Sequence, residues 1–70
     1  MEMKFVTYFM AIAKYRNLSK AADYLFVSQS TLSQFLAREE QELGVKLVSR
    51  NRSELTLTHA GELYEETCRN

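Results

Sequence analysis

The stretch SKAADYLFVSQSTLSQ, residues 19–34, decides which fold the sequence predicts. Two helices can approach closely only where their side chains are short, and the pair Ala21 and Ala22 provides such a place. An apolar turn follows at residues 26–27, and Ser28 is a good N-cap for a further helix. The stretch therefore predicts two helices joined by a tight turn, the second of which begins with polar side chains.

Helical periodicity extends to both sides of this stretch. Apolar residues at spacings of three and four predict a helix from about residue 3 to 15. We expect the next helix to begin at Ser19, whose hydroxyl can accept from the first N–H groups of the helix. The third helix is expected to run from Gln29 to about Leu43 and to end at Gly44, a residue that readily adopts the left-handed conformation.

Beyond Gly44 the pattern changes from helical to alternating. Val45 and Leu47, and later Leu55 and Leu57, predict two short strands around a polar tip at residues 50–53. Thr58 is then expected to cap a last helix, from His59 to about Arg69. This order predicts a mostly α fold with a small β-hairpin: a winged helix-turn-helix with a three-helix core and a two-stranded wing.

Length and composition limit the chain to one small domain. Its 70 residues, 46% of them hydrophobic, can support roughly one compact core, which argues against a deep catalytic cleft between lobes. His59 and Cys68 are the chain's single histidine and cysteine, and they are not part of a metal-ligand set. No nucleophile, base and orienting group occur together. We expect no enzyme activity, no cofactor and no metal.

The start of the third expected helix carries side chains suited to reading DNA bases. The major groove of B-DNA admits one α-helix, and a glutamine amide can pair with adenine through two hydrogen bonds. Short hydroxyl groups add adaptable donors and acceptors. Polar residues at a helix start are also typical of ordinary caps and solvated surface. The candidate base-reading residues are Gln29, Ser30, Thr31, Ser33 and Gln34.

A second set of residues is suited to DNA phosphates. The hairpin carries basic side chains without an acid before Glu54, which suits phosphates or the narrow minor groove, although a basic turn is also typical of a solvated loop. N–H groups at a helix start favour a phosphate oxygen as well. The candidate phosphate and wing residues are Ser19, Lys20, Ser28, Arg50 and Arg52.

A spaced set of residues along nearly the whole chain resembles the N-terminal domain of LysR-type transcriptional regulators. The set comprises Ala21-Ala22 with Leu25, Val27-Ser28-Gln29 with Leu32 and Ser33, Glu40, Glu42-Leu43-Gly44-Val45 with Leu47 and Arg50, and Leu57-Thr58 with Ala60-Gly61. The resemblance implies a bacterial winged helix-turn-helix domain that binds double-stranded promoter or operator DNA. In the family, residues at the positions of Gln29, Ser30, Ser33 and Gln34 approach the groove.

The resemblance also implies a domain organisation. Residues 1–58 would form the DNA-binding domain, with the helix-turn-helix motif at about 18–37 and the wing at about 46–57. Residues 59–70 would begin a linker helix that forms a homodimer. The effector-binding domain of the family is absent from this chain, so a small-molecule effector would act only through that missing domain. We expect a cytoplasmic, nucleoid-associated protein without a membrane segment.

Some residues depart from the family pattern. Glu39 stands where leucine is common, and it would need a basic partner or a locally rotated or shortened helix. Gln34 and Ser53 stand where basic residues are frequent, and Ser30 and Val48 where proline and phenylalanine are frequent. An alternative reading is therefore a winged-helix protein-interaction module that does not bind DNA, although such a face should expose apolar anchors.

The charges cancel in number, with nine basic and nine acidic residues, but they fall unevenly along the chain. We expect a basic DNA side and an acidic opposite side. The basic side would carry Lys14, Arg16, Lys20, Lys46, Arg50 and Arg52. The acidic side would carry Glu39, Glu40, Glu42, Glu62, Glu65 and Glu66, on solvated helix faces or in pairs between helices.

Overall fold

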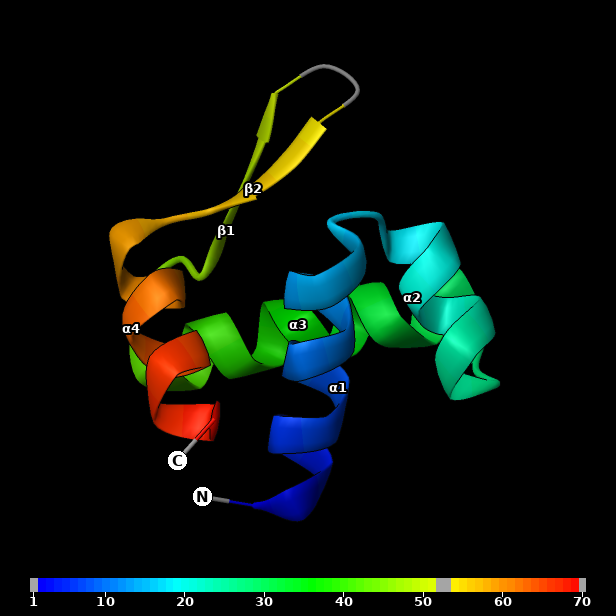
Figure 1. Ribbon diagram of the computed structural model, residues 1–70, viewed down its shortest axis with the longest axis horizontal. Helices are drawn as coiled ribbons and strands as arrows, with labels where there is room; N and C mark the ends of the chain where they lie inside the picture. Colours follow the sequence, from blue (N-terminus) through cyan, green and yellow to red (C-terminus); the bar gives the residue numbers. More distant parts are fainter. Residues whose placement is uncertain (1, 52–53, 70) are drawn as a thin grey trace.

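The computed structural model describes residues 2–51 and 54–69. In this part of the chain three helices precede a two-stranded antiparallel sheet, and a fourth helix follows it (Figure 1). The elements are α1 (Met3–Tyr15), α2 (Leu18–Leu25), α3 (Gln29–Leu43), β1 (Val48–Asn51), β2 (Glu54–Leu57) and α4 (His59–Arg69). This is the winged helix-turn-helix that the sequence predicts. The expected residue Arg52 lies outside the described residues.

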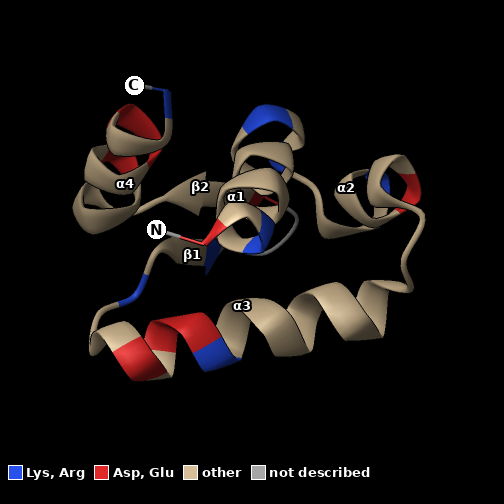
Figure 2. Cartoon of the chain, turned by 90° about the horizontal axis from the view of Figure 1, so that it is seen from below, with Lys and Arg blue, Asp and Glu red and all other residues tan. Residues whose placement is uncertain are grey.

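The core lies where α1 meets the other helices. Figure 2 shows α3 along one side of the molecule and α1, α2 and α4 across from it. Phe9 and Ile12 of α1, Ala21 of α2 and Leu32 of α3 are completely buried. The small side chain of Ala21 allows α1, α2 and α3 to pack closely at this point. The predicted apolar stripe of α1 is confirmed.

The start of α2 differs from the prediction. Asn17 is its N-cap, and its side-chain Oδ1 accepts a hydrogen bond from the N–H of Lys20 at 2.9 Å. Ser19 is exposed and lies inside the first turn, so the prediction that the helix begins at Ser19 was wrong. Asparagine and serine are both good caps, and the cap lies two residues earlier than predicted, at Asn17.

The ends of α3 match the prediction. Ser28 is its N-cap, with Oγ accepting from the N–H of Thr31 at 3.0 Å. Gly44 follows the last turn with φ +75°, in the left-handed region, and its N–H donates to the carbonyl oxygen of Glu40. The turn before α3 contains Phe26, also left-handed with φ +59°.

The first strand begins later than expected. Val45 is exposed, whereas Leu47 and Val48 are both buried, so the side chains do not alternate from Val45 onward. The reason is that the N–H groups of Leu47 and Val48 donate to a side chain of α3 before β1 pairs with β2. From Val48 the hairpin is regular, and Val48 is paired with Leu57.

The last helix is fixed to the segment before β1. Thr58 caps α4 as predicted, because its Oγ1 accepts from the N–H of Gly61 at 3.0 Å. The Thr58 hydroxyl also donates to the carbonyl oxygen of Lys46.

Within residues 2–51 and 54–69, none of the helices has the length and apolar character needed to cross a membrane.

Candidate nucleic-acid interface

The N-terminal half of α3 presents an uncharged polar surface. Figure 2 shows that the acidic and basic residues of α3 are confined to its other half. Leu32 and Leu36 face the core, and this orientation leaves Gln29, Ser30 and Gln34 exposed. In the described part of the chain, no hydrogen bond occupies the side chains of these exposed residues. Their amide and hydroxyl groups can therefore meet a ligand without breaking an internal contact.

The first turn of α3 has two kinds of donor available. The first backbone bond of the helix runs from the N–H of Leu32 to the carbonyl oxygen of Ser28, so the N–H groups of Gln29 and Ser30 precede it. Such N–H groups form a site for an anionic oxygen at a helix start. Thr31 is less available, because its hydroxyl accepts from Ser28 Oγ at 2.8 Å.

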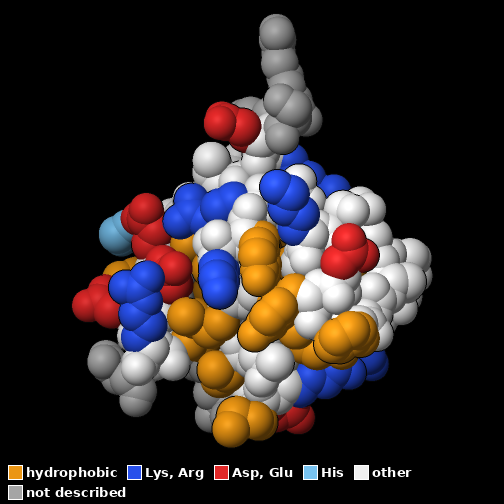
Figure 3. All heavy atoms as spheres, turned by 45° about the vertical axis from the view of Figure 1, so that its right-hand side comes forward, with side chains coloured by type: hydrophobic (Ala, Val, Ile, Leu, Met, Phe, Trp, Pro, Cys, Tyr) orange, Lys and Arg blue, Asp and Glu red, His pale blue; other side chains and the backbone are white. Residues whose placement is uncertain are grey.

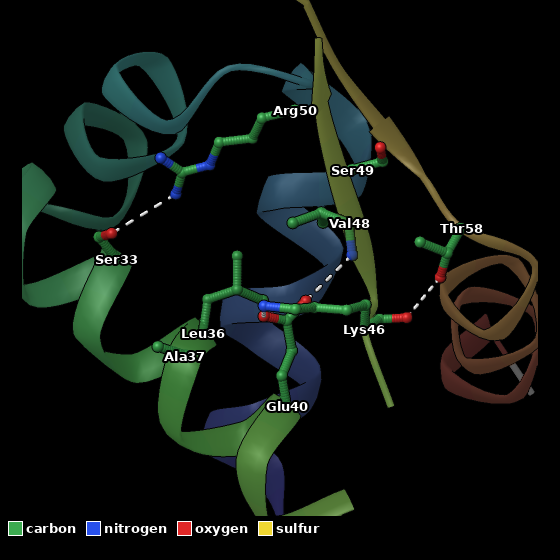
Figure 4. Close-up of a pocket in the computed structure, with 9 residues that line it drawn as sticks. All are labelled: Ser33, Leu36, Ala37, Glu40, Lys46, Val48, Ser49, Arg50 and Thr58. Carbon is green, nitrogen blue, oxygen red and sulfur yellow. Dashed lines mark hydrogen bonds and ion pairs between the residues drawn. The ribbon is translucent and has the colours of Figure 1, made fainter. Parts of the chain in front are cut away.

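Arg50 connects the wing to the middle of α3. One guanidinium nitrogen of Arg50 donates to Ser33 Oγ at 3.5 Å, as Figure 4 shows. Arg50 lines the hollow drawn in Figure 4 between α3 and β1. It also lines a second hollow with Gln29, Arg16 and Asn17. The structure thus brings the predicted base-reading residues Gln29 and Ser33 together with a predicted wing residue.

Two further predicted phosphate residues lie in α2. Ser19 and Lys20 are exposed in its first turn, next to Asn17. Arg16, just before this turn, is left-handed with φ +51°, and its Nε donates to the carbonyl oxygen of Ala13 at 2.8 Å. Of the residues at this end of α2, Arg16 and Asn17 line one hollow with Gln29, the first residue of α3. Ser28, the cap of α3, is exposed.

The separation of charge is less complete than the sequence suggested. The ammonium group of Lys14 lies over the rings of Tyr15 and Tyr24, and Lys14 lines a hollow that also contains Glu65. Lys46 lies 3.9 Å from Glu40. Lys14 and Lys46 thus each lie near an acidic residue, and the expected basic and acidic sides are not fully separated. Acidic side chains still gather around the pale-blue histidine in Figure 3.

Glu40 is a functional candidate that sequence reasoning missed. The prediction that Glu40 lies on a solvated helix face or in a pair between helices was wrong: Glu40 is 9% exposed, and its Oε2 accepts from the N–H groups of Leu47 at 2.7 Å and Val48 at 3.1 Å. The spacing contained the signal, because Leu32, Leu36 and Glu40 follow each other at intervals of four and share one face of a helix.

Glu39 and Cys68 have no role in the candidate interface. Glu39 is half-exposed on a continuous α3, so the helix is not shortened, and no ion pair of Glu39 occurs among the described residues. Burial raises the pKa of the Cys68 thiol, which lowers the fraction of reactive thiolate. In the described ranges, histidine, cysteine and acidic residues do not form a group of three that could hold a metal.

Comparison with known proteins places this geometry in context. The family model described as "Bacterial regulatory helix-turn-helix protein, lysR family" matches residues 3–62. The HTH-type transcriptional regulator BudR of Klebsiella aerogenes is 41% identical over 70 residues, which are 99% of this chain and 49% of that protein. AlsR of Bacillus subtilis (strain 168) is 39% identical over 69 residues, 99% of this chain and 23% of that protein. The chain thus spans half or less of the length of these curated relatives.

Two solved DNA complexes have the same fold. The crystal structure of the CbnR_DBD–DNA complex has a TM-score of 0.90 and 36% identity, and the match covers 99% of this chain and 79% of that chain. The BenM_DBD/benA site 1 DNA complex has a TM-score of 0.92 and 30% identity, and the match covers 99% of this chain and 80% of that chain.

Proposed function

Because the chain belongs to the lysR family of bacterial regulatory helix-turn-helix proteins, we propose that it regulates transcription by binding double-stranded DNA at specific sequences. The observation that carries this proposal is the exposed, uncharged first half of α3 beside Arg50. A single helix of this kind fits the major groove, and Gln29 at its first position can pair with an adenine through two hydrogen bonds.

We assign the contacts with bases and the contacts with phosphates to different residues. Gln29, Ser30 and Gln34 expose side chains that can reach base edges, whereas the hydroxyls of Ser33 and Thr31 already accept hydrogen bonds from Arg50 and Ser28. Ser19, Lys20, Ser28 and Arg50 hold the phosphate backbone. Arg52 belongs to this second group by sequence alone. The CbnR_DBD and BenM_DBD structures, which have the same fold, are DNA complexes, and this supports DNA as the ligand.

The last helix supports a dimeric form of the protein. Leu63 of α4 is 52% exposed, and such an apolar side chain can contribute to a seam between two copies. We assign residues 1–58 to DNA binding, with the helix-turn-helix motif at about 18–37 and the wing at about 46–57, and residues 59–70 to the beginning of the dimerising helix. A two-fold dimer would place two copies of α3 on related half-sites.

We extend the proposal to the effector and to the place in the cell where the protein acts. A small-molecule effector would act through a region of the relatives that this chain does not span. We assign the chain no catalytic reaction and place its action on the nucleoid in the cytoplasm.

One observation favours the alternative, a winged-helix module that binds protein instead of DNA. Phe26 is 95% exposed and Tyr24 is 57% exposed at the end of α2, and Figure 3 shows a band of hydrophobic side chains on one face. Exposed aromatic residues are typical anchors of protein interfaces. DNA binding requires Gln29 and Arg50 for contacts with bases and phosphates, whereas a protein-interaction module does not require either residue.

One experiment separates the two functions. Duplexes are selected from a random pool by the chain, and the selected duplex is titrated at several salt concentrations. The proposed function predicts enrichment of one motif and an affinity that falls with salt as expected for a few phosphate contacts. Absence of binding to any duplex at low salt would favour the protein-interaction module.

A further inference from the structure

Three parts of the fold meet at the backbone of Leu47, whose side chain is fully buried. Its N–H donates to Oε2 of Glu40 in α3 at 2.7 Å. Its carbonyl oxygen accepts from the N–H of Thr58 at 3.0 Å and lies against Gly61 of α4. The segment that leads into β1 is therefore held by α3 on one side and by the start of α4 on the other.

Glu40 is the contact through which α3 holds the wing. The same Oε2 accepts a second hydrogen bond, at 3.1 Å, from the N–H of Val48, the first residue of β1 (Figure 4). Hydrogen bonds from N–H groups to a carboxylate are stronger than those between neutral groups. Two of them on neighbouring peptides fix the direction in which β1 leaves the core.

The charge of Glu40 has a separate and weaker partner. Oε1 faces the ammonium group of Lys46 at 3.9 Å, and the Lys46 side chain is 81% exposed. Pairs with an exposed partner contribute little. Both backbone hydrogen bonds end on Oε2, so the carbonyl oxygen of a glutamine side chain could accept both of them. The hydrogen bonds and the charge can therefore be separated by substitution.

We propose that Glu40 is a positioning residue for DNA binding: it fixes the wing relative to α3, so that both reach the DNA together. This inference rests on the proposed function. The reading half of α3 is anchored by Leu32 and Leu36, which are buried in the core formed with α1 and α2. Loss of the Glu40 hydrogen bonds therefore removes phosphate contacts of the wing and leaves the base preference of α3 unchanged.

The test uses two opposite variants of the same residue. Glu40→Asp keeps the charge but withdraws the carboxylate by one methylene, and Glu40→Gln keeps the reach but loses the charge. The control is Glu42→Gln, a change of the same type on an exposed glutamate of α3. Each variant is titrated with the selected duplex at several salt concentrations, below its unfolding temperature, and its base preference is measured by competition with mutated duplexes.

The proposal predicts a specific pattern. Glu40→Asp should lower the slope of log K against log salt by about one or two, because each lost phosphate contact removes about 0.9 from the slope. Its base preference should not change. Glu40→Gln and Glu42→Gln should keep the wild-type slope. Simple destabilisation would reduce the active fraction without moving the slope. An unchanged slope in Glu40→Asp, or an equal loss in Glu40→Gln, would overturn the proposal.

A second measurement needs no DNA. Amide hydrogen exchange of Leu47 and Val48 is followed by NMR in the same variants. Glu40→Asp should speed exchange of both amides by about tenfold or more relative to the core amide of Leu36, since a hydrogen bond to a charged group is lost at each. Unchanged protection would overturn the positioning role. Failure of the wild-type chain to bind any duplex would instead overturn the proposed function, and the exchange result would still decide whether Glu40 holds the wing.

Discussion

Gly61 of α4 lies directly against the carbonyl oxygen of Leu47, and a β-carbon on residue 61 would overlap that oxygen. The close approach is possible because glycine has no side chain. It allows the start of α4 to pack on the segment before β1, where the Thr58 cap and the Glu40 carboxylate also bind. The wing, α3 and α4 therefore share one junction.

Gly61→Ala should destabilise the protein, because α4 or the backbone at Leu47 must move to accept the methyl group. We expect a loss of about 3 kcal/mol in the free energy of unfolding, at the upper end for an overpacked site because the atom in the way is backbone, measured by urea denaturation. Gly44→Ala is the matched control. Gly44 has a positive φ, but open space surrounds the place that a β-carbon would take, so its substitution costs only backbone strain of about 1–2 kcal/mol. An equal or smaller loss for Gly61→Ala would contradict the role of the close approach.

The cap of α2 gives a second prediction. Asn17→Ala should lower the free energy of unfolding by about 1 kcal/mol, because the N–H of Lys20 loses its acceptor. Ser19→Ala should change it by less than about 0.5 kcal/mol, since Ser19 is exposed inside the helix. Urea denaturation of both variants measures the difference. A larger loss for Ser19→Ala would show that serine is the cap in solution.

Much of the fold could be predicted from the sequence because its signals are local. The stripe of α1 and the caps of α3 depend on residues a few positions apart. The start of β1 could not be predicted, because the N–H groups of Leu47 and Val48 are taken by Glu40 of α3, a contact that no local pattern contains. Asn17 and Ser19 are both good caps, and local chemistry does not distinguish them.

The site was predictable to a similar extent. Exposure of Gln29, Ser30 and Gln34 follows from the inward orientation of Leu32 and Leu36, which periodicity alone indicates. The contact of Arg50 with Ser33 joins two elements that are distant in sequence, and its existence depends on how the wing folds back on α3. The ammonium group of Lys14 likewise lies over tyrosine rings of two helices, a contact that depends on how α1 and α2 pack.

Gln29→Ala tests base readout. If the amide pairs with one adenine, its removal should cost about 1–3 kcal/mol of binding free energy and relax the preference at one base pair. Competition titration with duplexes mutated one position at a time measures both effects. The exposed Gln41 in the distal half of α3 offers a matched control, and Gln41→Ala should bind as the wild type does. Equal effects of the two variants would contradict readout by the first turn of α3.

The basic wing residue outside the described part of the chain has a different expected effect. Arg52→Ala should weaken binding to all duplexes alike and lower the salt slope by about one, as expected for the loss of a phosphate contact. Titrations of specific and unrelated duplexes at several salt concentrations measure this. A selective loss on the specific duplex would mean that Arg52 reads sequence.

Leu63→Glu tests the dimer. Leu63 is 52% exposed in the single chain, so a charged side chain there should change the free energy of unfolding of the monomer by less than about 0.5 kcal/mol. In a two-fold dimer the same change is introduced twice, and burial of unpaired carboxylates opposes association. Analytical ultracentrifugation should therefore show a shift toward monomer, and binding to a duplex with two half-sites should weaken more than binding to one half-site. Met3→Glu, at a residue 78% exposed on α1, is the control and should leave association unchanged. If Leu63→Glu keeps the wild-type association and the wild-type preference for paired half-sites, the dimer does not use this face of α4.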